Sequence, residues 1–185
     1  MLYQLDSNNR TEYSKVKRIT LAEIGWKEID LQRLLSQHIQ DFIYSNELMT
    51  IFNERPRQEE PDILALDKKG DLYILELKRW SSDKENLLQV LRYGQLYGGS
   101  NYDELNELYK KYSGSNKELC EVHKDYFELS EDEALKKHLF NNQQHFLVVT
   151  NGLDQQTIDA IRYWKNNNLN IDAIIYWVFE IEGKH

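Results

Sequence analysis

The segment from Pro61 to Trp80, PDILALDKKGDLYILELKRW, constrains the fold more than any other part of the chain. Two apolar runs, at 62–67 and 71–79, flank Lys68-Lys69-Gly70. A three-residue loop with glycine in the left-handed conformation commonly joins two antiparallel strands. Strands that are apolar on both faces are typical of a sheet covered by helices on both sides. We therefore expect a buried hairpin within an α/β protein.

The same hairpin carries charged residues that strand pairing alone does not require. With the three-residue loop, Asp62 lies opposite Glu76. Lys78 then projects to the same face as Glu76, about 7 Å further along the strand. A two-residue loop would shift the register by one residue and send Asp62 to the other face. The turn therefore decides whether these three side chains converge.

Two carboxylates held together in apolar surroundings need a cation between them, or the pKa of at least one must rise. Magnesium binds through one or two carboxylates and keeps several waters. Lys78 can hold or deprotonate a water and can stabilise charge on a phosphate. The group suits metal-assisted hydrolysis of a phosphodiester. In the alternative interpretation, Glu76 and Lys78 lie at an exposed strand end and form minor ion pairs.

The rest of the chain alternates predicted helices and strands, which favours one mixed sheet with helices on both faces. Before the hairpin we expect a weak edge strand at 16–21, an amphipathic helix over 27–44 and a short strand at 48–54. A helix from about Asp83 to Tyr97, capped by Ser81, Ser82 or Asp83, should follow the hairpin. The remaining elements are polar helices over 101–140 with a break at 113–116, a strand at 145–150, a helix over 154–167 and a last strand at 172–181.

Charge and composition limit the partners. The net charge of −8 argues against a protein that binds nucleic acid over its whole surface. Residues 101–140 hold ten acidic and six basic side chains, whereas Lys15, Lys17 and Arg18 cluster near the N-terminus. A polyanion should therefore meet the N-terminal part and the region of Lys78 and Arg79. With no leader and no long apolar segment in the sequence, we expect one cytoplasmic domain over 1–185 without membrane contact.

Pro61-Asp62 followed by Glu76-Leu77-Lys78 resembles the motif of the PD-(D/E)xK nuclease superfamily. QVLRY, with Gln89 and Tyr93 one helical turn apart, is similar to the QxxxY element of RecB-type nucleases. ILELKRW followed by QVLRYGQLYG looks like the ELKR branch of repair and restriction nucleases, and HFLVVTNGLDQQTIDAI resembles the next strand and helix. The resemblance implies a restriction endonuclease-like core with 101–140 as a helical acidic insertion.

The resemblance also implies a nuclease that depends on Mg²⁺ or Mn²⁺ and acts on nucleic acid, with DNA preferred. An endonuclease in restriction, repair or anti-phage defence is the usual setting. Asp62, Glu76 and the backbone carbonyl of Leu77 would bind the metal, and Lys78 would position or activate water. Gln89 and Tyr93 would orient the substrate or that water.

Several assignments stay open in the sequence. An acidic residue of the first helix often joins the metal site in this superfamily; Glu28 is the first candidate and Asp30 the second, although either can cap the helix. Arg79 and Arg92 are candidate phosphate contacts or solvated charges. The whole chain can also be an inactive nuclease-like module for nucleic-acid binding or assembly. A homodimer formed through residues 101–140 is a further alternative.

Overall fold

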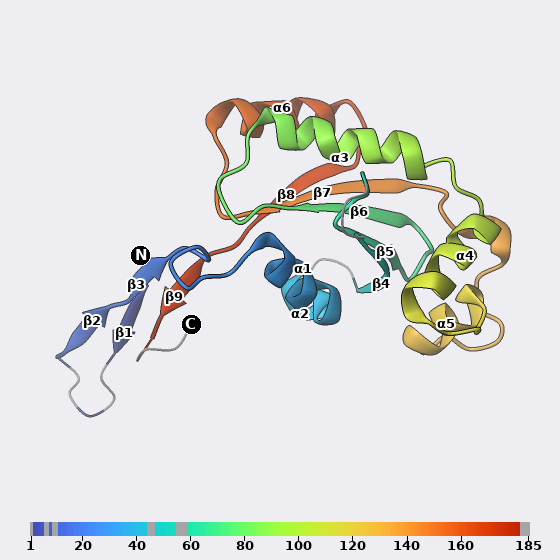
Figure 1. The fold of residues 1–185 in the computed structure, drawn as a ribbon, viewed down its shortest axis with the longest axis horizontal. Helices are drawn as coiled ribbons and strands as arrows, with labels where there is room; N and C mark the ends of the chain where they lie inside the picture. Colours follow the sequence, from blue (N-terminus) through green and yellow to red (C-terminus); the bar gives the residue numbers. More distant parts are fainter. Residues whose placement is uncertain (1, 6–7, 9–10, 44–46, 55–58, 182–185) are drawn as a thin grey trace.

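The computed structural model describes residues 2–5, 8, 11–43, 47–54 and 59–181. A five-stranded sheet lies at its centre, in the order β4-β5-β6-β7-β8 (Figure 1). The first three strands are antiparallel and the last three are parallel, so the mixed sheet that we expected is confirmed. The strands are β4 (Leu48–Asn53), β5 (Ile63–Asp67), β6 (Leu72–Leu77), β7 (Gln144–Thr150) and β8 (Ile171–Ile175).

The turn between β5 and β6 is the three-residue loop that the sequence predicts. Gly70 has a φ of +84°, and its N–H donates to the Asp67 carbonyl at 3.0 Å. The Asp67 carboxylate accepts from the backbone N–H of Asp71 at 3.0 Å. Leu66 therefore pairs with Leu72, and the register continues to the far end of the hairpin.

Helices cover both faces of this sheet, as expected (Figure 1). Helices α3 (Lys84–Tyr97) and α6 (Gln155–Asn166) lie on one face, and α1 (Glu28–Gln37) and α2 (Ile39–Phe42) lie on the other. Leu64 and Ile74 belong to the apolar cluster on the α3 side, whereas Ile63 and Leu75 belong to the cluster on the α1 side. Both faces of β5 and β6 are buried, which explains why apolar residues occupy both faces of these strands.

The predicted helix over 27–44 is wrong as a single helix, because the backbone leaves the helical region at His38. The N–H of His38 closes α1 on the carbonyls of Leu34 and Leu35. The new direction of α2 lets Ile39 and Ile43 enter the apolar cluster on the α1 face. Residue 44 lies outside the described residues. The predicted helix after the hairpin is confirmed, with Asp83 as its N-cap.

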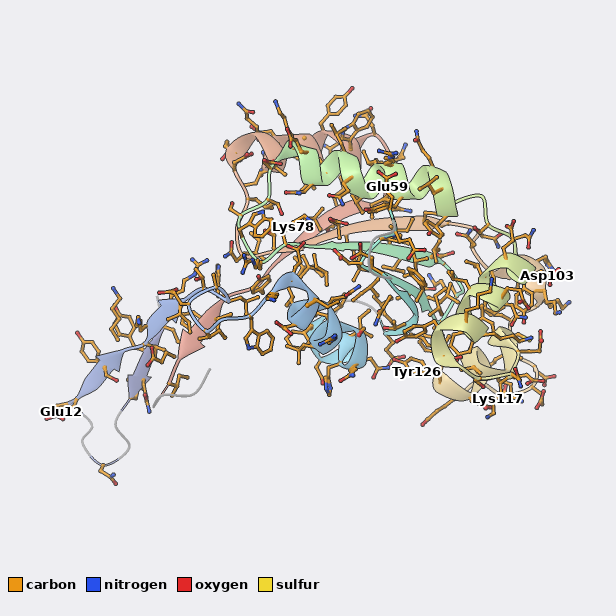
Figure 2. The ribbon with its side chains drawn as sticks, viewed as in Figure 1. Glu12, Glu59, Lys78, Asp103, Lys117 and Tyr126 are labelled. Carbon is orange, nitrogen blue, oxygen red and sulfur yellow. The ribbon has the colours of Figure 1, made fainter. Side chains whose placement is uncertain are left out.

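Residues 101–140 form α4 (Tyr102–Ser113), α5 (Leu119–Tyr126) and a short 3₁₀ helix, η1 (Lys137–Leu139). They contact the turn end of the hairpin, where His123 Nε2 lies 2.8 Å from the Asp67 carbonyl. Figure 2 shows Lys78 at one end of the sheet and Asp103, Lys117 and Tyr126 at the other. The acidic helices are therefore remote from Lys78.

The two predicted outer strands are partly wrong. The segment at 16–21 contains β3 (Lys17–Ile19), which does not border the central sheet but pairs with β9 (Val178–Glu180). The predicted last strand is two strands, β8 and β9. The partner of β8 is β7, which ends at Thr150, and the Thr150 carbonyl accepts the last hydrogen bond of this pair from Tyr176 N–H. Beyond this point the chain pairs with β3 as β9. Two further strands, β1 (Tyr3–Leu5) and β2 (Tyr13–Lys15), were not predicted; they pair with each other beyond β3 in a projecting arm (Figure 1).

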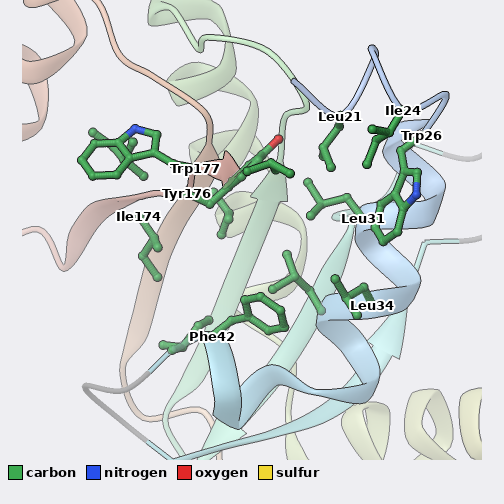
Figure 3. Close-up of a pocket in the computed structure, with 14 residues that line it drawn as sticks. Leu21, Ile24, Trp26, Leu31, Leu34, Phe42, Ile174, Tyr176 and Trp177 are labelled. Carbon is green, nitrogen blue, oxygen red and sulfur yellow. The ribbon is translucent and has the colours of Figure 1, made fainter. Parts of the chain in front are cut away.

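A small apolar cavity of about 260 Å³ lies on the α1 face between α1 and the β8 edge (Figure 3). Leu31 and Leu34 line one side of it, and Ile174 and Tyr176 line the other. No helix in the described part of the chain is long and apolar enough to cross a membrane.

Candidate active site

Asp62 and Glu76 lie on the same face of the sheet, as the predicted register requires. The pairing of Ile63 with Leu75 places Asp62 opposite Glu76 at the next step. Alternation along each strand then turns both carboxyls to the α3 face, with Leu64 and Ile74. Asp62 is 7% exposed and Glu76 is 2% exposed. Both carboxyls are therefore held in the dry interior at the end of the hairpin.

Three hydrogen bonds fix the position of Asp62. Its Oδ2 accepts from the backbone N–H of Leu77 at 2.6 Å, which ties the start of β5 to the end of β6. Its carbonyl accepts from Gln32 Nε2 of α1 at 2.7 Å and from the N–H of Glu54 at 3.0 Å. One bond thus holds the carboxyl of Asp62, and the other two hold its backbone.

Lys78 lies between two carboxylates. Its Nζ is 2.6 Å from Glu76 Oε1 and 3.4 Å from Glu28 Oε1, and the residue is 7% exposed. Burial would lower the pKa of Lys78, but the Glu76, Glu28 and Asp62 carboxylates raise it above its ordinary value. Lys78 is therefore a charged ammonium at neutral pH.

Within the described ranges, the carboxyls of this cluster outnumber its cations. Burial, together with the nearby Glu76 charge, raises the pKa of Asp62 well above its ordinary value. Burial raises the pKa of Glu76 to about 7, although Lys78 opposes the shift. These shifts mean that the site cannot hold all of its carboxylates ionised with Lys78 as the one cation that the described residues place among them.

Glu54 is an acidic neighbour that the sequence did not single out. Burial raises its pKa, and its carboxyl lies within hydrogen-bonding reach of the Asp62 carboxyl. Two carboxyls within hydrogen-bonding reach of each other share either a proton or a cation. Glu54 follows β4 directly, and the antiparallel pairing of β4 with β5 brings it beside Asp62. That pairing was the signal that could have identified it.

Helix α3 brings Gln89 and Tyr93 to the same face. Gln89 Nε2 donates to the Tyr93 hydroxyl at 2.9 Å, so the two side chains form one unit. Tyr93 is 4% exposed; burial raises its pKa, and the charges of Glu76, Asp62 and Glu54 add to this effect. The Tyr93 hydroxyl therefore faces the carboxyl cluster across the helix–sheet interface.

The structure separates the two acidic candidates of the first helix. Glu28 reaches Lys78 with Oε1, and its Oε2 lies 3.4 Å from the backbone N–H of Arg79. Asp30 accepts from the backbone N–H of Lys27 at 2.8 Å and caps the start of α1. Glu28 is thus the residue that joins the cluster, through Lys78.

The two predicted phosphate contacts lie in different surroundings. Arg79 follows Lys78, donates to the Trp26 carbonyl at 3.1 Å and is stacked on the Trp80 ring at 5.4 Å. Arg92 lies on the exposed side of α3 and pairs with Glu59 at 2.9 Å. Arg79 borders the cluster, whereas Arg92 is engaged in a surface ion pair.

The residues present fit a hard divalent cation by their chemistry. Asp62, Glu76 and the Leu77 carbonyl offer only oxygen donors, which Mg²⁺ and Mn²⁺ prefer. The surplus of buried carboxyls supplies the negative charge that such an ion neutralises. Among the described residues, no group of three or more His, Cys, Asp or Glu side chains is already arranged around a metal position.

No protein-family model and no curated protein matches the chain. Among solved structures, a complex of EndoMS with double-stranded DNA aligns with a TM-score of 0.44 and 13% identity, over 80% of this chain and 44% of that one. A repair endonuclease from Pyrococcus abyssi aligns with a TM-score of 0.44 and 14% identity, over 93% of this chain and 71% of that one. This chain thus spans less than half the length of the EndoMS chain. At these scores no property of either protein is carried over to it.

Proposed function

We propose that the protein is a divalent-metal-dependent nuclease that hydrolyses phosphodiester bonds, with DNA as its preferred substrate and internal cleavage as its mode. One observation carries this proposal. Asp62 and Glu76 are buried on one face of the sheet with Lys78 as the adjacent ammonium. The alternative interpretation needs Glu76 and Lys78 to be exposed ion-paired residues at a strand end, but both are buried.

The electrostatics of the cluster support a bound cation. Burying a carboxylate without compensation costs several kcal/mol, and a carboxyl avoids this by staying protonated. The pKa values of Asp62 and Glu76 are raised because ionising these buried carboxyls is unfavourable. Asp62, Glu76 and the Leu77 carbonyl would hold the ion, and Glu54 is a further oxygen donor within reach. When bound, the metal supplies Lewis-acid stabilisation and a lowered pKa for its water.

The raised pKa of Lys78 favours one of its two expected roles. An ammonium that keeps its proton at neutral pH is a poor base, but it can donate hydrogen bonds to the attacking water and to a non-bridging phosphate oxygen. Glu28 holds the same ammonium from the other side and positions it. Lys78 therefore stabilises developing negative charge and leaves proton removal to another group.

Gln89 and Tyr93 act as a positioning pair in this proposal. Their hydrogen bond fixes the Tyr93 hydroxyl, which the charges of the carboxyls reach and which can orient a phosphate or a water. The acidic helices of 101–140 lie at the opposite end of the sheet, so their charge does not block the approach of a polyanion. We also propose that these helices are inserted into one domain formed by the whole chain.

The test is a cleavage panel with Mg²⁺ or Mn²⁺ on supercoiled plasmid and on single-stranded, duplex, nicked and branched DNA and RNA. Metal-dependent cleavage should disappear in Glu76→Gln and Lys78→Ala, while the exposed substitution Glu107→Gln should leave it intact. Circular dichroism and thermal unfolding establish that each variant is folded. Cleavage that is unchanged in folded Glu76→Gln contradicts the assignment.

A second candidate is an inactive nuclease-like module, and one observation favours it. Lys78 already forms a 2.6 Å ion pair with Glu76, so the carboxylate has a partner without any metal. Calorimetric titration with Mn²⁺ distinguishes the two. A nuclease site should bind Mn²⁺ and lose that binding in Glu76→Gln, whereas an inactive module should bind no Mn²⁺ at this position.

A further inference from the structure

A groove of about 750 Å³ lies at the base of the projecting arm. Lys15, Lys17 and Arg18 line it together with the aromatic rings of Trp177 and Phe179, and no carboxylate from the described part of the chain is among its lining residues. Glu180 does pair with Lys17 at 3.5 Å on the neighbouring strand position. In a protein with a net charge of −8, this is a local basic surface with aromatic side chains.

Two tryptophans in this region are exposed, and an arginine is stacked on each. Trp177 is 59% exposed, and the Arg18 guanidinium lies 5.4 Å from its ring centre. Trp80 is 50% exposed, and the Arg79 guanidinium lies 5.4 Å from its ring centre. An arginine covers one face of an indole and leaves the other face free for stacking. We call Arg18, Trp177, Arg79 and Trp80 the Arg–Trp surface.

Hydrogen bonds connect the two halves of the Arg–Trp surface. Arg18 Nη2 donates to the Asn151 carbonyl at 2.9 Å, and Asn151 Nδ2 donates to the Arg79 carbonyl at 3.1 Å. Asn151 follows β7 directly, so both halves lie at the strand ends that carry Lys78.

The surface also joins the candidate active site through the backbone. The Tyr176 hydroxyl donates to the Lys78 carbonyl at 3.0 Å. Figure 3 shows the rings of Tyr176 and Trp177 pointing in opposite directions. Tyr176 thus anchors this turn to the Lys78 backbone, while Trp177 lines both the apolar cavity and the groove at the base of the arm.

We propose that the Arg–Trp surface and the adjoining groove bind unpaired nucleotides, so that the substrate has a single-stranded segment beside the bond that is cut. Bases stacked in a duplex hide their faces, whereas an unpaired base can stack on an exposed indole. Lys15, Lys17 and the two arginines meet the phosphates of such a strand. The placement of this strand relative to the cut rests on the proposed nuclease function, but its binding does not require hydrolysis.

The test measures binding without metal, so that no cleavage occurs. Fluorescence anisotropy with EDTA compares a labelled oligothymidylate with a labelled duplex of the same length. The native protein should bind the single strand more tightly. Trp177→Ala and Trp80→Ala should each weaken that binding about 5-fold to about 150-fold, the effect of losing one stacked base. Trp177→Phe should keep most of the affinity, because the ring remains.

Trp164→Ala is the matched control. Trp164 is also exposed, at 44%, but its carbonyl accepts from Leu169 N–H near the start of β8, at the other end of the sheet. Its substitution should leave single-strand binding unchanged. Equal affinity for single strand and duplex overturns the proposal. The proposal is also overturned if Arg18→Ala loses single-strand binding while both tryptophan variants keep it, because charge alone then explains the binding.

The two proposals fail separately. Cleavage that depends on Glu76, in a protein that binds single strand and duplex equally, supports the nuclease and overturns the single-strand surface. Single-strand binding that is lost in Trp177→Ala, in a protein whose cleavage does not depend on Glu76, supports the surface and contradicts the nuclease assignment.

Discussion

Replacing Glu76 by glutamine should remove a specific pH dependence of stability. Burial raises the pKa of Glu76 from 4.5 to about 7. A group whose pKa is raised on folding binds its proton more tightly in the folded state than in the unfolded state. The contribution of Glu76 to the free energy of unfolding is therefore greatest below pH 4.5, and it falls as the pH rises to about 7. Each tenfold change in proton affinity is worth about 1.4 kcal/mol, so the loss amounts to about 3 kcal/mol. For a chain of this length that is a fall in Tm of about 6–12 °C.

Glutamine keeps the size of Glu76 but cannot ionise, so Glu76→Gln should lack this component. The assay is thermal unfolding followed by circular dichroism from pH 4.5 to 7, with the native protein, Glu76→Gln and the exposed control Glu107→Gln. The difference between native and Glu76→Gln reports the titration of Glu76 together with its effect on Asp62, whose pKa the Glu76 charge raises.

A divalent cation should reverse the loss at neutral pH. Ligand at about 100 times its Kd stabilises a folded protein by about 2.7 kcal/mol, and only the ionised site binds metal. Mn²⁺ should therefore raise the Tm of the native protein at neutral pH and leave Glu76→Gln unchanged. Identical pH profiles for the two proteins would contradict the raised pKa of Glu76, and equal stabilisation of both by Mn²⁺ would contradict its part in metal binding.

Three further perturbations test other parts of the site and fold. Lys78→Met should abolish cleavage yet keep Mn²⁺ binding by calorimetry, because it removes the ammonium and leaves the carboxylates; lost binding would make Lys78 necessary for the metal site itself. Tyr93→Phe should lower kcat about 100-fold with Mn²⁺ affinity unchanged, since only the hydroxyl that orients the reacting groups is removed; an unchanged kcat would confine Tyr93 to packing. Gly70→Ala should cost about 1–2 kcal/mol in denaturant unfolding, because φ is +84° and a Cβ would lie 2.9 Å from Leu135 Cδ1; a neutral effect would show that the turn does not require glycine.

The sequence predicted the central hairpin because its determinants are local. The Lys68-Lys69-Gly70 loop and the apolar runs around it specify both the turn and the register. That register was enough to bring Asp62 and Glu76 to one face, as the structure confirms. The helix with Gln89 and Tyr93 was predicted for the same reason, since the Asp83 cap and the apolar spacing lie within one segment.

The parts that escaped prediction depend on contacts between distant segments. Glu54 reaches Asp62 only through the pairing of β4 with β5. Tyr3–Leu5 and Tyr13–Lys15 are exposed throughout, so β1 and β2 carry no burial pattern to reveal them. The pairing of β3 with β9 joins the two ends of the chain, and it places Arg18 beside Trp177.

We infer that a divalent metal binds between Asp62 and Glu76. Anomalous diffraction from crystals soaked in Mn²⁺ would locate this metal. We expect one strong anomalous peak in contact with both carboxylates and the Leu77 carbonyl, and no such peak in Glu76→Gln. A native map without a peak at this position, with the Lys78–Glu76 ion pair retained, would contradict it.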